Sequence, residues 1–448
     1  MGRRPKLKQD EPRQVKIQKF KTPSLVRGVR DILPNEQGYW NFLYKKIDEL
    51  ARKYNYQKIT LPLLEEKALF QRAIGKYNDL IANEFFSFSD PGGSNICLRP
   101  EATASVVRAY IRHGMHALPQ PVKLYYAGPM FRYERPQSGR QREFYQFGFE
   151  VIGDKNPILD AQLILMSYNF FNELNIKIRV QVNSIGCQMC RPGYVKEFTK
   201  FLKNKKSRLC SECKNLLGKN SLKILNCKEK SCQFVKEESP QIIDWLCEDC
   251  KAHFVKVLEY LDDLDVPYEL NPYLVRNLDY YTKTIFEIWP DEGGEQNNSC
   301  NSLGAGGRYD NLVEMLDGKY SPACGFAIGI ERTIAQLKRQ NFYVPQPYTP
   351  VVFLAQLGEQ AKRKSLKLFE ELHENNIYAV ESFSTDNLKA QLDMAARLKV
   401  KFTLLLGQKE VLDNTILIRD MDGGMQEIID FKKAVTEIKK KIEEMGNI

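Results

Sequence analysis

Two runs of aromatic and β-branched residues flank a cationic segment in and just before the stretch Ala127–Gly153. Such residues at near-alternate positions are typical of half-buried strands. Between the runs lies Arg135–Arg142 (RPQSGRQR), which is rich in proline, glycine and fixed charge. The pattern predicts a β-hairpin with a long cationic tip. Its apolar positions are Leu124, Tyr126, Phe131 and Tyr133 before the tip and Phe144, Phe147, Phe149 and Val151 after it.

Charged and amide side chains interrupt this apolar pattern. Strand residues two apart share a face, so Arg132 and Glu134 point the same way, as do Gln146 and Glu150. A face with a forked cation, carboxylates and an amide suits a ligand that is cationic at one end and anionic at the other. The same residues also suit a solvated sheet face with ordinary ion pairs, so the hairpin alone leaves function open.

Size and composition restrict the class of protein. A chain of 448 residues, 43% hydrophobic and 27% charged, is typical of a soluble globular protein with two to four domains. No apolar run approaches ~20 residues, so no membrane-spanning helix is expected. The N-terminus lacks the apolar core of a signal peptide, and we therefore expect a cytoplasmic protein.

The net charge of +10 is concentrated at the N-terminus. Residues 1–21 hold eight Lys or Arg and two Asp or Glu, a net charge of +6. This tail has little to bury and is expected to be disordered. It would attract a polyanion such as RNA by counterion release, or serve only as a solubilising arm.

Several elements before the hairpin can be placed from periodicity. An apolar stripe predicts a helix that begins near Asn35. Pro62 removes a ladder donor from the run Ile59–Leu64, which therefore reads as an edge strand. Glu101 and Thr103 lie where a predicted hairpin runs into a helix, and there they would hold an ammonium group or cap the helix. The stripe consists of Trp40, Leu43, Ile47 and Leu50.

Eight of the eleven cysteines lie between Cys187 and Cys250, inside a folded insertion expected over 184–266. They form four close pairs, and repeated C-x2-C spacing is typical of zinc sites. A cytoplasmic chain would keep these thiols reduced, so disulfides are not expected. Two interpretations remain: one or two structural zinc ions, or small buried residues without a metal. The tentative ligands of a structural zinc are Cys187, Cys190, Cys210 and Cys213.

Three later segments combine arginine with aromatic residues or glycines. Leu274–Thr282 (LVRNLDYYT) holds one arginine and two tyrosines. Gly304–Asp310 (GAGGRYD) is a glycine-rich turn, which lets the backbone approach a ligand closely. Cys324–Arg332 predicts a strand that enters a helix, and Arg332 in its first turn could stack on adenine or fork onto phosphate.

Beyond a proline-bearing linker over 341–350, strands alternate with helices, which predicts a mostly parallel α/β domain over 351–448. The expected strands are Val351–Ala355, Ile377–Val380, Phe402–Leu406, Thr415–Asp420 and Met425–Ile429. The expected helices are Glu359–Glu374, Leu388–Leu398 and a final one striped by Val435, Ile438, Ile442 and Met445.

Taken in order, these segments resemble the histidyl-tRNA synthetase family of class II aminoacyl-tRNA synthetases. The resemblance rests on FRYE and GRQREFYQ in the hairpin, on LVRNLDYYT, on GAGGRYD and on GFAIGIER. It implies an α+β catalytic domain over 22–183 and 267–340, with a mainly antiparallel sheet and flanking helices. The 184–266 insertion interrupts that domain, and 351–448 is implied to be an anticodon-binding domain.

The resemblance also implies a reaction and roles for residues. Histidine would be joined to tRNA(His) through histidyl-adenylate, with ATP and Mg²⁺, by a homodimer. Arg132 and Arg276 would be catalytic. The histidine site would comprise Glu101, Ala102, Thr103, Arg132, Gln146, Glu150, Arg276, Tyr280 and Tyr281. ATP would meet Arg132, Glu134 and Arg332, and the tRNA acceptor end would meet Gln137 and Arg140.

Two positions depart from the family pattern, since Ala102 and Asn277 stand where the family usually has glycine. The alternative function is that of a non-catalytic relative, the regulatory subunit of ATP phosphoribosyltransferase. Arg276 and the complete C-terminal domain oppose it, because both would be expected to be lost in that relative.

Overall fold

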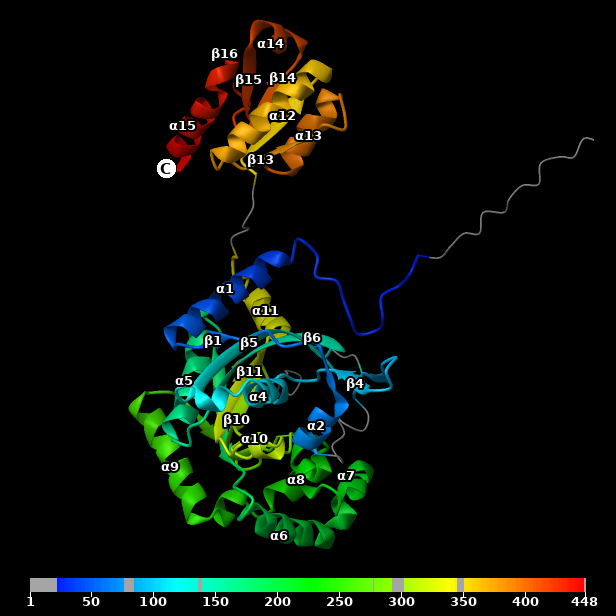
Figure 1. Ribbon diagram of the computed structural model, residues 1–448, viewed down its shortest axis with the longest axis vertical. Coiled ribbons are helices and arrows are strands. Elements are labelled where there is room, and N and C mark those ends of the chain that lie inside the picture. Colours follow the sequence, from blue (N-terminus) through cyan, green and yellow to red (C-terminus); the bar gives the residue numbers. More distant parts are fainter. Residues whose placement is uncertain are drawn as a thin grey trace, which may run out of the picture. The chain divides into compact units, whose positions relative to one another are not determined.

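The computed structural model describes residues 22–75, 84–135, 139–276, 278–291, 302–344 and 350–446 (Figure 1). The chain divides into two compact units, Met1–Tyr343 and Val344–Ile448, and each has its own hydrophobic core. The basic tail over 1–21 lies outside the described residues, so its predicted disorder and its contacts stay predictions.

An eight-stranded sheet forms the centre of the first unit, in the order β1-β5-β6-β11-β10-β9-β7-β8. Neighbouring strands are antiparallel except at the two edges, where β1 pairs with β5 and β7 with β8 in parallel. The predicted hairpin is β5–β6, which pairs from Val122 opposite Ile152 to Phe131 opposite Glu143. The strands are β1 (Gln57–Lys58), β5 (Val122–Phe131), β6 (Glu143–Ile152), β7 (Ile178–Ser184), β8 (Glu269–Leu270), β9 (Thr282–Pro290), β10 (Gly304–Arg308) and β11 (Ala323–Gly329).

Helices cover this sheet with their apolar stripes. The helix predicted near Asn35 is α1 (Gln37–Lys53), and the four residues of its predicted stripe are all buried. α5 (Ile158–Glu173) packs against α9 (Glu248–Asp263). The other helices of the first unit outside the insertion are α2 (Lys67–Ile74), α4 (Thr103–Arg112), η1 (Met115–Ala117), α10 (Leu312–Met315) and α11 (Ile330–Arg339). The predicted α+β fold of this unit is confirmed.

The predicted edge strand over Ile59–Leu64 is wrong in extent. Pairing at that edge ends at Ile59, whose N–H donates to the Tyr125 carbonyl of β5 (2.9 Å). The next strand, β2 (Leu64–Glu66), joins a separate sheet with β4 (Asn95–Leu98) and β3 (Ser87–Ser89). The buried guanidinium of Arg99 explains the gap, since its Nη1 donates to the carbonyls of Leu61 (3.1 Å) and Pro62 (3.4 Å). A side chain therefore occupies acceptors that a neighbouring strand would otherwise use.

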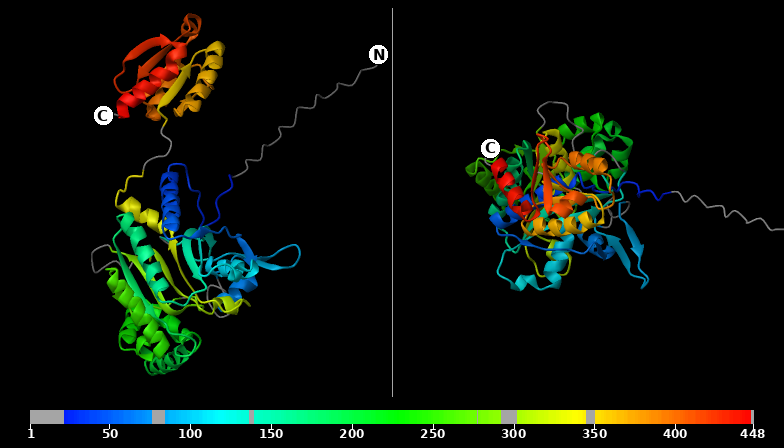
Figure 2. Two further views of the ribbon diagram at one scale, coloured as in Figure 1. Left: turned by 60° about the vertical axis from the view of Figure 1, so that its left-hand side comes forward. Right: turned by 90° about the horizontal axis from the view of Figure 1, so that it is seen from above.

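The insertion forms a helical lobe at one end of the first unit, green in Figures 1 and 2. It connects β7 to β8, which lie side by side in the sheet. Before α9 come α6 (Arg191–Asn204), α7 (Ser211–Leu216) and α8 (Lys230–Glu237), with short 3₁₀ turns η2 (Lys206–Arg208), η3 (Ser221–Asn226) and η4 (Ile242–Trp245).

The second unit is the predicted α/β domain, and its fold class is confirmed. Its sheet has the order β13-β12-β14-β15-β16, parallel among the first three strands and antiparallel after them. Sequence analysis missed α14 (Gln408–Asp413), because six residues are too few to show a helical period. The remaining bounds are β12 (Val352–Gln356), α12 (Glu359–Glu374), β13 (Ala379–Glu381), α13 (Leu388–Arg397), β14 (Phe402–Leu406), β15 (Thr415–Asp420), β16 (Gln426–Asp430), η5 (Phe431–Lys433) and α15 (Ala434–Gly446).

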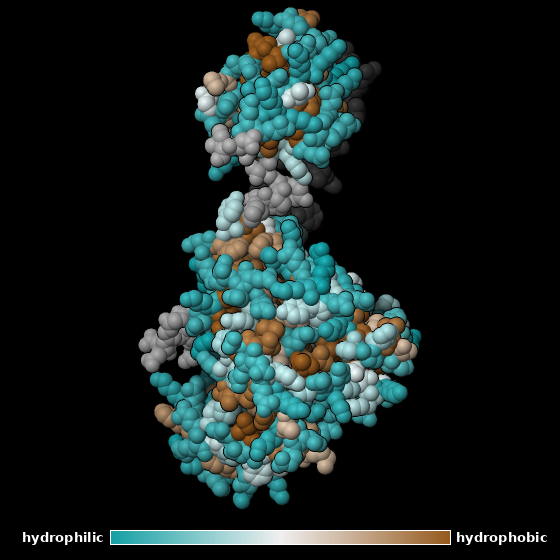
Figure 3. All heavy atoms as spheres, turned by 90° about the vertical axis from the view of Figure 1, so that its left-hand side faces the viewer, coloured by the Kyte–Doolittle hydropathy of each residue, from teal (hydrophilic) through white to brown (hydrophobic). Residues whose placement is uncertain are grey.

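The surface is mostly hydrophilic on the face drawn in Figure 3, where hydrophobic residues gather in small separate patches. Among the described residues, no helix is long and apolar enough to span a membrane.

Candidate active site

A cavity of about 290 Å³ lies against the central sheet of the first unit. Its walls come from segments far apart in the sequence: the start of α4, the β5–β6 hairpin, the loop before β9, strands β10 and β11, and the start of α11. Much of the predicted site is therefore brought together in one place. The predicted residues that line the cavity are Glu101, Thr103, Arg132, Glu134, Arg140, Gln146, Arg276, Tyr280, Tyr281 and Arg332.

Arginines surround the carboxylate of Glu134 at the hairpin. Arg132 Nη1 lies 3.9 Å from one carboxylate oxygen of Glu134, and Arg140 Nη1 lies 3.4 Å from the other. Arg132 is held in place because its Nε donates to the Pro100 carbonyl (2.9 Å) and its guanidinium lies 5.3 Å from the centre of the Phe144 ring. This wall carries more positive than negative charge, so it favours an anionic ligand.

Arg332 adds a third guanidinium to this wall from the first turn of α11. Its Nη1 donates to the Ser302 carbonyl (2.6 Å), and its Nε donates to the Gly139 carbonyl (3.3 Å). Burial, followed by repulsion from Arg140 and Arg132, lowers the pKa of Arg332 to about 10. The group remains charged near neutral pH, and a bound anion would relieve the repulsion.

Glu101 marks the acidic part of the cavity. Its carboxylate accepts hydrogen bonds from the backbone N–H groups of Thr103 (2.6 Å) and Ala104 (3.0 Å), the first two residues of α4. The Tyr280 hydroxyl lies 3.5 Å away. Burial is the largest influence and raises the pKa of Glu101, although both backbone donors oppose it. Glu101 therefore caps the helix and also presents a carboxylate to the cavity.

Glu150 is a second buried carboxylate beside the cavity, reached through Thr103. Thr103 Oγ1 donates to one of its oxygens (2.8 Å), and the Tyr309 hydroxyl donates to the other. Burial raises the pKa of Glu150 to about 8, against the effect of these two donors. Gly325 leaves room for the Glu150 side chain, since a Cβ on residue 325 would lie 1.7 Å from one carboxylate oxygen of Glu150.

Arg276 lines the cavity from the loop before β9 and pairs with Glu287 on that strand. Burial lowers its pKa, but the charge of Glu287 and the nearby tyrosines outweigh burial, so the pKa of Arg276 is raised. Its Nε is buried and has no hydrogen-bond partner among the described residues. The rings of Tyr280 and Tyr281 lie beside it, with centroids 4.9 Å apart.

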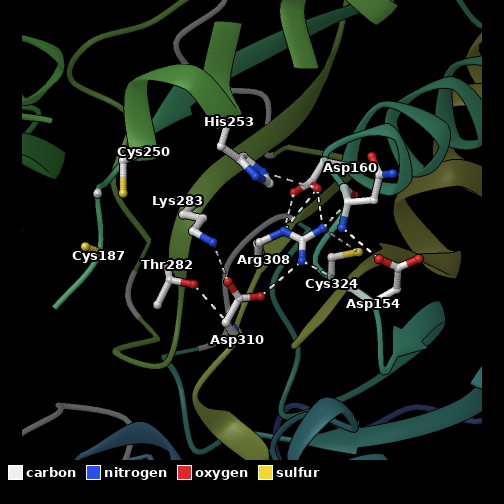
Figure 4. A network of polar contacts seen from close by, with 12 residues as sticks. Asp154, Asp160, Cys187, Cys250, His253, Thr282, Lys283, Arg308, Asp310 and Cys324 are labelled. Atoms are coloured by element: carbon white, nitrogen blue, oxygen red, sulfur yellow. Dashed lines mark hydrogen bonds and ion pairs between the residues drawn. The ribbon is translucent and has the colours of Figure 1, made fainter. Parts of the chain in front are cut away.

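A buried ionic network holds the residue before Tyr309 (Figure 4). Arg308, which is 0% exposed, donates to the carboxylate of Asp160 on α5 from Nε (3.0 and 3.1 Å) and from Nη2 (2.5 Å). Its Nη1 donates to Asp310 (3.0 Å). His253 on α9 lies 3.4 Å from Asp160. The network anchors the backbone that presents Tyr309 to Glu150.

Ala102 and Glu150 are the predicted histidine-site residues that do not line the cavity. Ala102 is buried in the core at the start of α4, so its extra methyl packs inward. Gln137 and Asn277 lie outside the described residues, and the expectations for them stay predictions. Sequence reasoning missed Tyr309 and Asp160. The GAGGRYD motif was a signal for Tyr309, whereas nothing in the helical pattern around Asp160 pointed to a distant arginine.

The cysteines of the insertion are grouped differently from the prediction. The first pair does not come together with the second, so Cys187, Cys190, Cys210 and Cys213 do not form one site. The pairs are nested instead, because the chain folds back on itself between α6 and α9. The outer cluster consists of Cys187, Cys190, Cys247 and Cys250, and the inner cluster of Cys210, Cys213, Cys227 and Cys232.

The raised pKa of Glu150 predicts a pH-dependent stability. The folded state holds this proton up to about pH 8, whereas an unfolded chain releases it near the ordinary value of 4.5. The free energy of unfolding should therefore fall as pH rises through this window, by up to ~1.4 kcal/mol per pH unit for this group. Urea unfolding followed by tryptophan fluorescence should show that, as pH rises toward about 8, the free energy of unfolding falls less for Glu150→Gln than for wild type. The exposed Glu173→Gln variant is the control, and an equal decline in all three proteins would contradict the prediction.

Comparisons with known proteins match both units of the chain. Residues 28–333 match the family model described as histidyl-tRNA synthetase. Residues 351–441 match the model described as anticodon binding domain. The two matches cover the catalytic unit and the C-terminal unit respectively.

Individual relatives are similar over nearly the whole chain. A histidine–tRNA ligase of Dehalococcoides mccartyi is 42% identical over 417 residues, which are 93% of this chain and 99% of that protein. One from Desulforamulus reducens is 40% identical over 92% of this chain and 98% of its own length. The crystal structure of apo histidyl-tRNA synthetase from S. aureus is 35% identical, with a TM-score of 0.76 over 93% of this chain and 99% of that one.

Proposed function

This chain belongs to the histidyl-tRNA synthetase family, and from that premise we propose how its cavity joins histidine to tRNA(His) with ATP. The chain is a class II histidine–tRNA ligase. The observation that supports the proposed roles best is the arrangement of one cavity, which is lined by the buried carboxylate of Glu101 and by the guanidinium groups of Arg132, Arg276 and Arg332. Glu150 lies buried directly behind Thr103.

The first step joins histidine to the α-phosphate. A carboxylate oxygen of histidine attacks the α-phosphorus of ATP, the bond to the β-phosphate bridging oxygen breaks, and pyrophosphate leaves. Negative charge moves over the α-phosphate, so catalysis consists mainly of positioning and charge stabilisation. We assign this stabilisation to Arg132 and Arg276. The unpartnered Nε of Arg276 supports the assignment, because a buried donor without an acceptor is ready for a ligand oxygen.

The same arginine-rich wall would hold the rest of ATP. Arg332 would bind the phosphate tail, where its lowered pKa reports repulsion that an anion would remove. The family implies a divalent metal, for which we propose Mg²⁺. The carboxylate of Glu134 lines the cavity among arginines and is a hard oxygen ligand of the kind that Mg²⁺ prefers. Glu134 would hold the ion together with the phosphates, whose charge the ion would reduce.

The acidic part of the cavity would bind histidine. Glu101, Thr103 and Gln146 would hold the α-ammonium group. Glu150 and Tyr281 would meet the two imidazole nitrogens, of which one can donate while the other accepts. A site that pairs both nitrogens rejects apolar rivals, because their binding leaves buried polar groups unpaired. Tyr280 would complete the wall.

In the second step the 3′-terminal ribose hydroxyl of tRNA(His) attacks the histidyl carbonyl carbon, and AMP leaves. Arg140 lines the cavity with a half-exposed side chain, and we propose that it contacts the acceptor end together with Gln137. The second unit would bind the anticodon, as the anticodon-binding family model supports.

We further propose that the protein is a cytoplasmic homodimer. Light scattering would test the dimer, which should have a mass of twice 51.9 kDa.

Histidine-dependent exchange of pyrophosphate into ATP tests the function directly. We expect exchange with histidine and none with the other nineteen amino acids. Exchange driven by another amino acid would contradict the assignment of Glu150 and Tyr281. Folded protein that binds histidine without exchange would instead favour the regulatory-subunit alternative.

A further inference from the structure

The two cysteine clusters have the spacing that a single tetrahedral ion requires. In the outer cluster, Cys187 Sγ lies 3.7 Å from Cys190 Sγ and 3.8 Å from Cys247 Sγ, and Cys190 Sγ lies 3.9 Å from Cys250 Sγ. Four thiolates at ~2.3 Å from one zinc stand about 3.8 Å apart. A cluster with several irons divides the four thiolates among its irons, and thiolates on different irons lie farther apart than those in these clusters.

The inner cluster repeats this arrangement. Cys210 Sγ lies 3.9 Å from Cys227 Sγ, and all four ligand atoms of each cluster lie within 4.8 Å of one another. Cysteines of the described residues are free thiols rather than disulfides. Four thiolates so close together repel one another, and a divalent cation at their centre removes that repulsion.

Backbone groups in both clusters already point at sulfur. The N–H groups of Met189 and Cys187 donate to Cys187 Sγ (3.4 Å) and Cys190 Sγ (3.2 Å). In the inner cluster, the N–H groups of Cys213 and Cys210 donate to Cys210 Sγ (3.4 Å) and Cys232 Sγ (3.2 Å). Such donors orient and stabilise metal-bound sulfur, and they complete the second shell that a metal site needs.

We propose that the insertion binds two structural zinc ions, one in each cysteine cluster. The outer ion would hold the first and last segments of the insertion together beside the histidine pocket. The nested pairing supports this, since Cys187 and Cys190 follow β7 while Cys247 and Cys250 begin α9. The outer ion therefore ties the start of the lobe to its end. A small lobe with a limited core gains much of its stability from such ions.

Two contacts lead from the outer cluster to the pocket. Arg191, next to Cys190, donates through Nη2 to the backbone carbonyl of Tyr281 (2.5 Å). His253, one turn after Cys250 on α9, lies beside Asp160 in the network that holds Arg308, as Figure 4 shows. Both contacts start within three residues of an outer-cluster cysteine, so we expect the outer ion to have the larger effect on histidine binding.

Metal analysis of the full-length protein, purified without chelators, tests the first part. We expect two zinc ions per chain by mass spectrometry, with four sulfur ligands at ~2.3 Å by X-ray absorption. Substitution by Co²⁺ should give the visible bands of a tetrahedral thiolate complex, which needs no variant to fold. Fewer than two ions, iron in place of zinc, or cysteines found as disulfides would each overturn the proposal.

Paired variants test the location of the ions. Cys187→Ser with Cys247→Ser should remove the outer ion and leave one zinc, and so should Cys210→Ser with Cys227→Ser for the inner ion. Cys97→Ser is the matched control, because Cys97 is a buried thiol outside the insertion, and it should keep two ions. Loss of both ions from either paired variant that still has wild-type helical content would overturn two independent sites.

Ligand binding tests the link to the pocket, which rests on the proposed function for the identity of the ligand. By calorimetry, the outer variant should bind histidine about tenfold more weakly with ATP affinity changed less than about twofold, and the inner variant should keep both affinities. Equal losses in both variants would overturn the link. Metal counts are independent of ligands, so a protein without histidine binding but with two zinc ions would refute the proposed function alone.

Discussion

Replacing Arg276 with alanine is expected to lower the rate of histidine-dependent pyrophosphate exchange by about 10²- to 10³-fold. Removing one preorganised donor to a developing oxyanion typically has an effect of this size. The loss should appear mainly in kcat, because the charge on the α-phosphate grows in the transition state. Arg276→Lys should recover only part of the rate, since an ammonium group cannot reproduce the planar fork of a guanidinium.

Two controls separate catalysis from folding in this test. Glu287, the partner of Arg276, loses its ion pair in the variant, so thermal unfolding of each variant must be compared with wild type. Arg179→Ala removes an arginine on β7 whose side chain is 49% exposed and lies outside the cavity, and it should leave the rate unchanged. An Arg276→Ala protein with wild-type kcat would remove Arg276 from the mechanism.

Replacing Arg308 with methionine is expected to lower the free energy of unfolding of the first unit by about 3–5 kcal/mol. The substitution leaves Asp160 and Asp310 buried with one charge partner fewer, and breaking a buried ionic network typically costs this much. All three tryptophans lie before residue 343, so their fluorescence during urea unfolding reports on this unit alone. Since Tyr309 follows directly, histidine binding should weaken as well.

A surface ion pair provides the contrast. Arg72 pairs with Asp317 at 3.1 Å, but both side chains are more than half exposed, at 52% and 82%. Arg72→Met should therefore change the stability by less than ~1 kcal/mol. If Arg308→Met were no more costly than Arg72→Met, the buried network would not stabilise the fold, and its role would have to be sought in catalysis alone.

The local sequence pattern was sufficient to predict the strands and helices whose apolar residues recur at a clear period. The β5–β6 hairpin and α1 follow directly from alternation and from a helical stripe, and α12, β14 and β15 have their predicted bounds. The cavity residues could be named because their motifs lie within short segments. Such predictions succeed where the physical cause lies within the element itself or in its neighbours along the chain.

Contacts between distant segments could not be read in this way. Arg99 interrupts a predicted strand nearly forty residues before it, and Asp160 meets an arginine on another strand. The cysteine pairs show the same limit, since spacing favoured neighbours whereas folding joined the first pair to the last. One-dimensional spacing carries no information on which pairs a helical lobe brings face to face.

The position of the insertion between β7 and β8 has an evolutionary consequence. These strands are parallel neighbours at one edge of the sheet, with Gln181 opposite Glu269 and Val182 opposite Leu270. A parallel pair always needs a crossover connection, and the sheet requires only that its two ends lie close together. The crossover can therefore lengthen, shorten or acquire new metal chemistry between related proteins while the register of the catalytic strands is preserved. An edge crossover of this kind lets the lobe differ between related chains while the strands that carry the cavity keep their pairing.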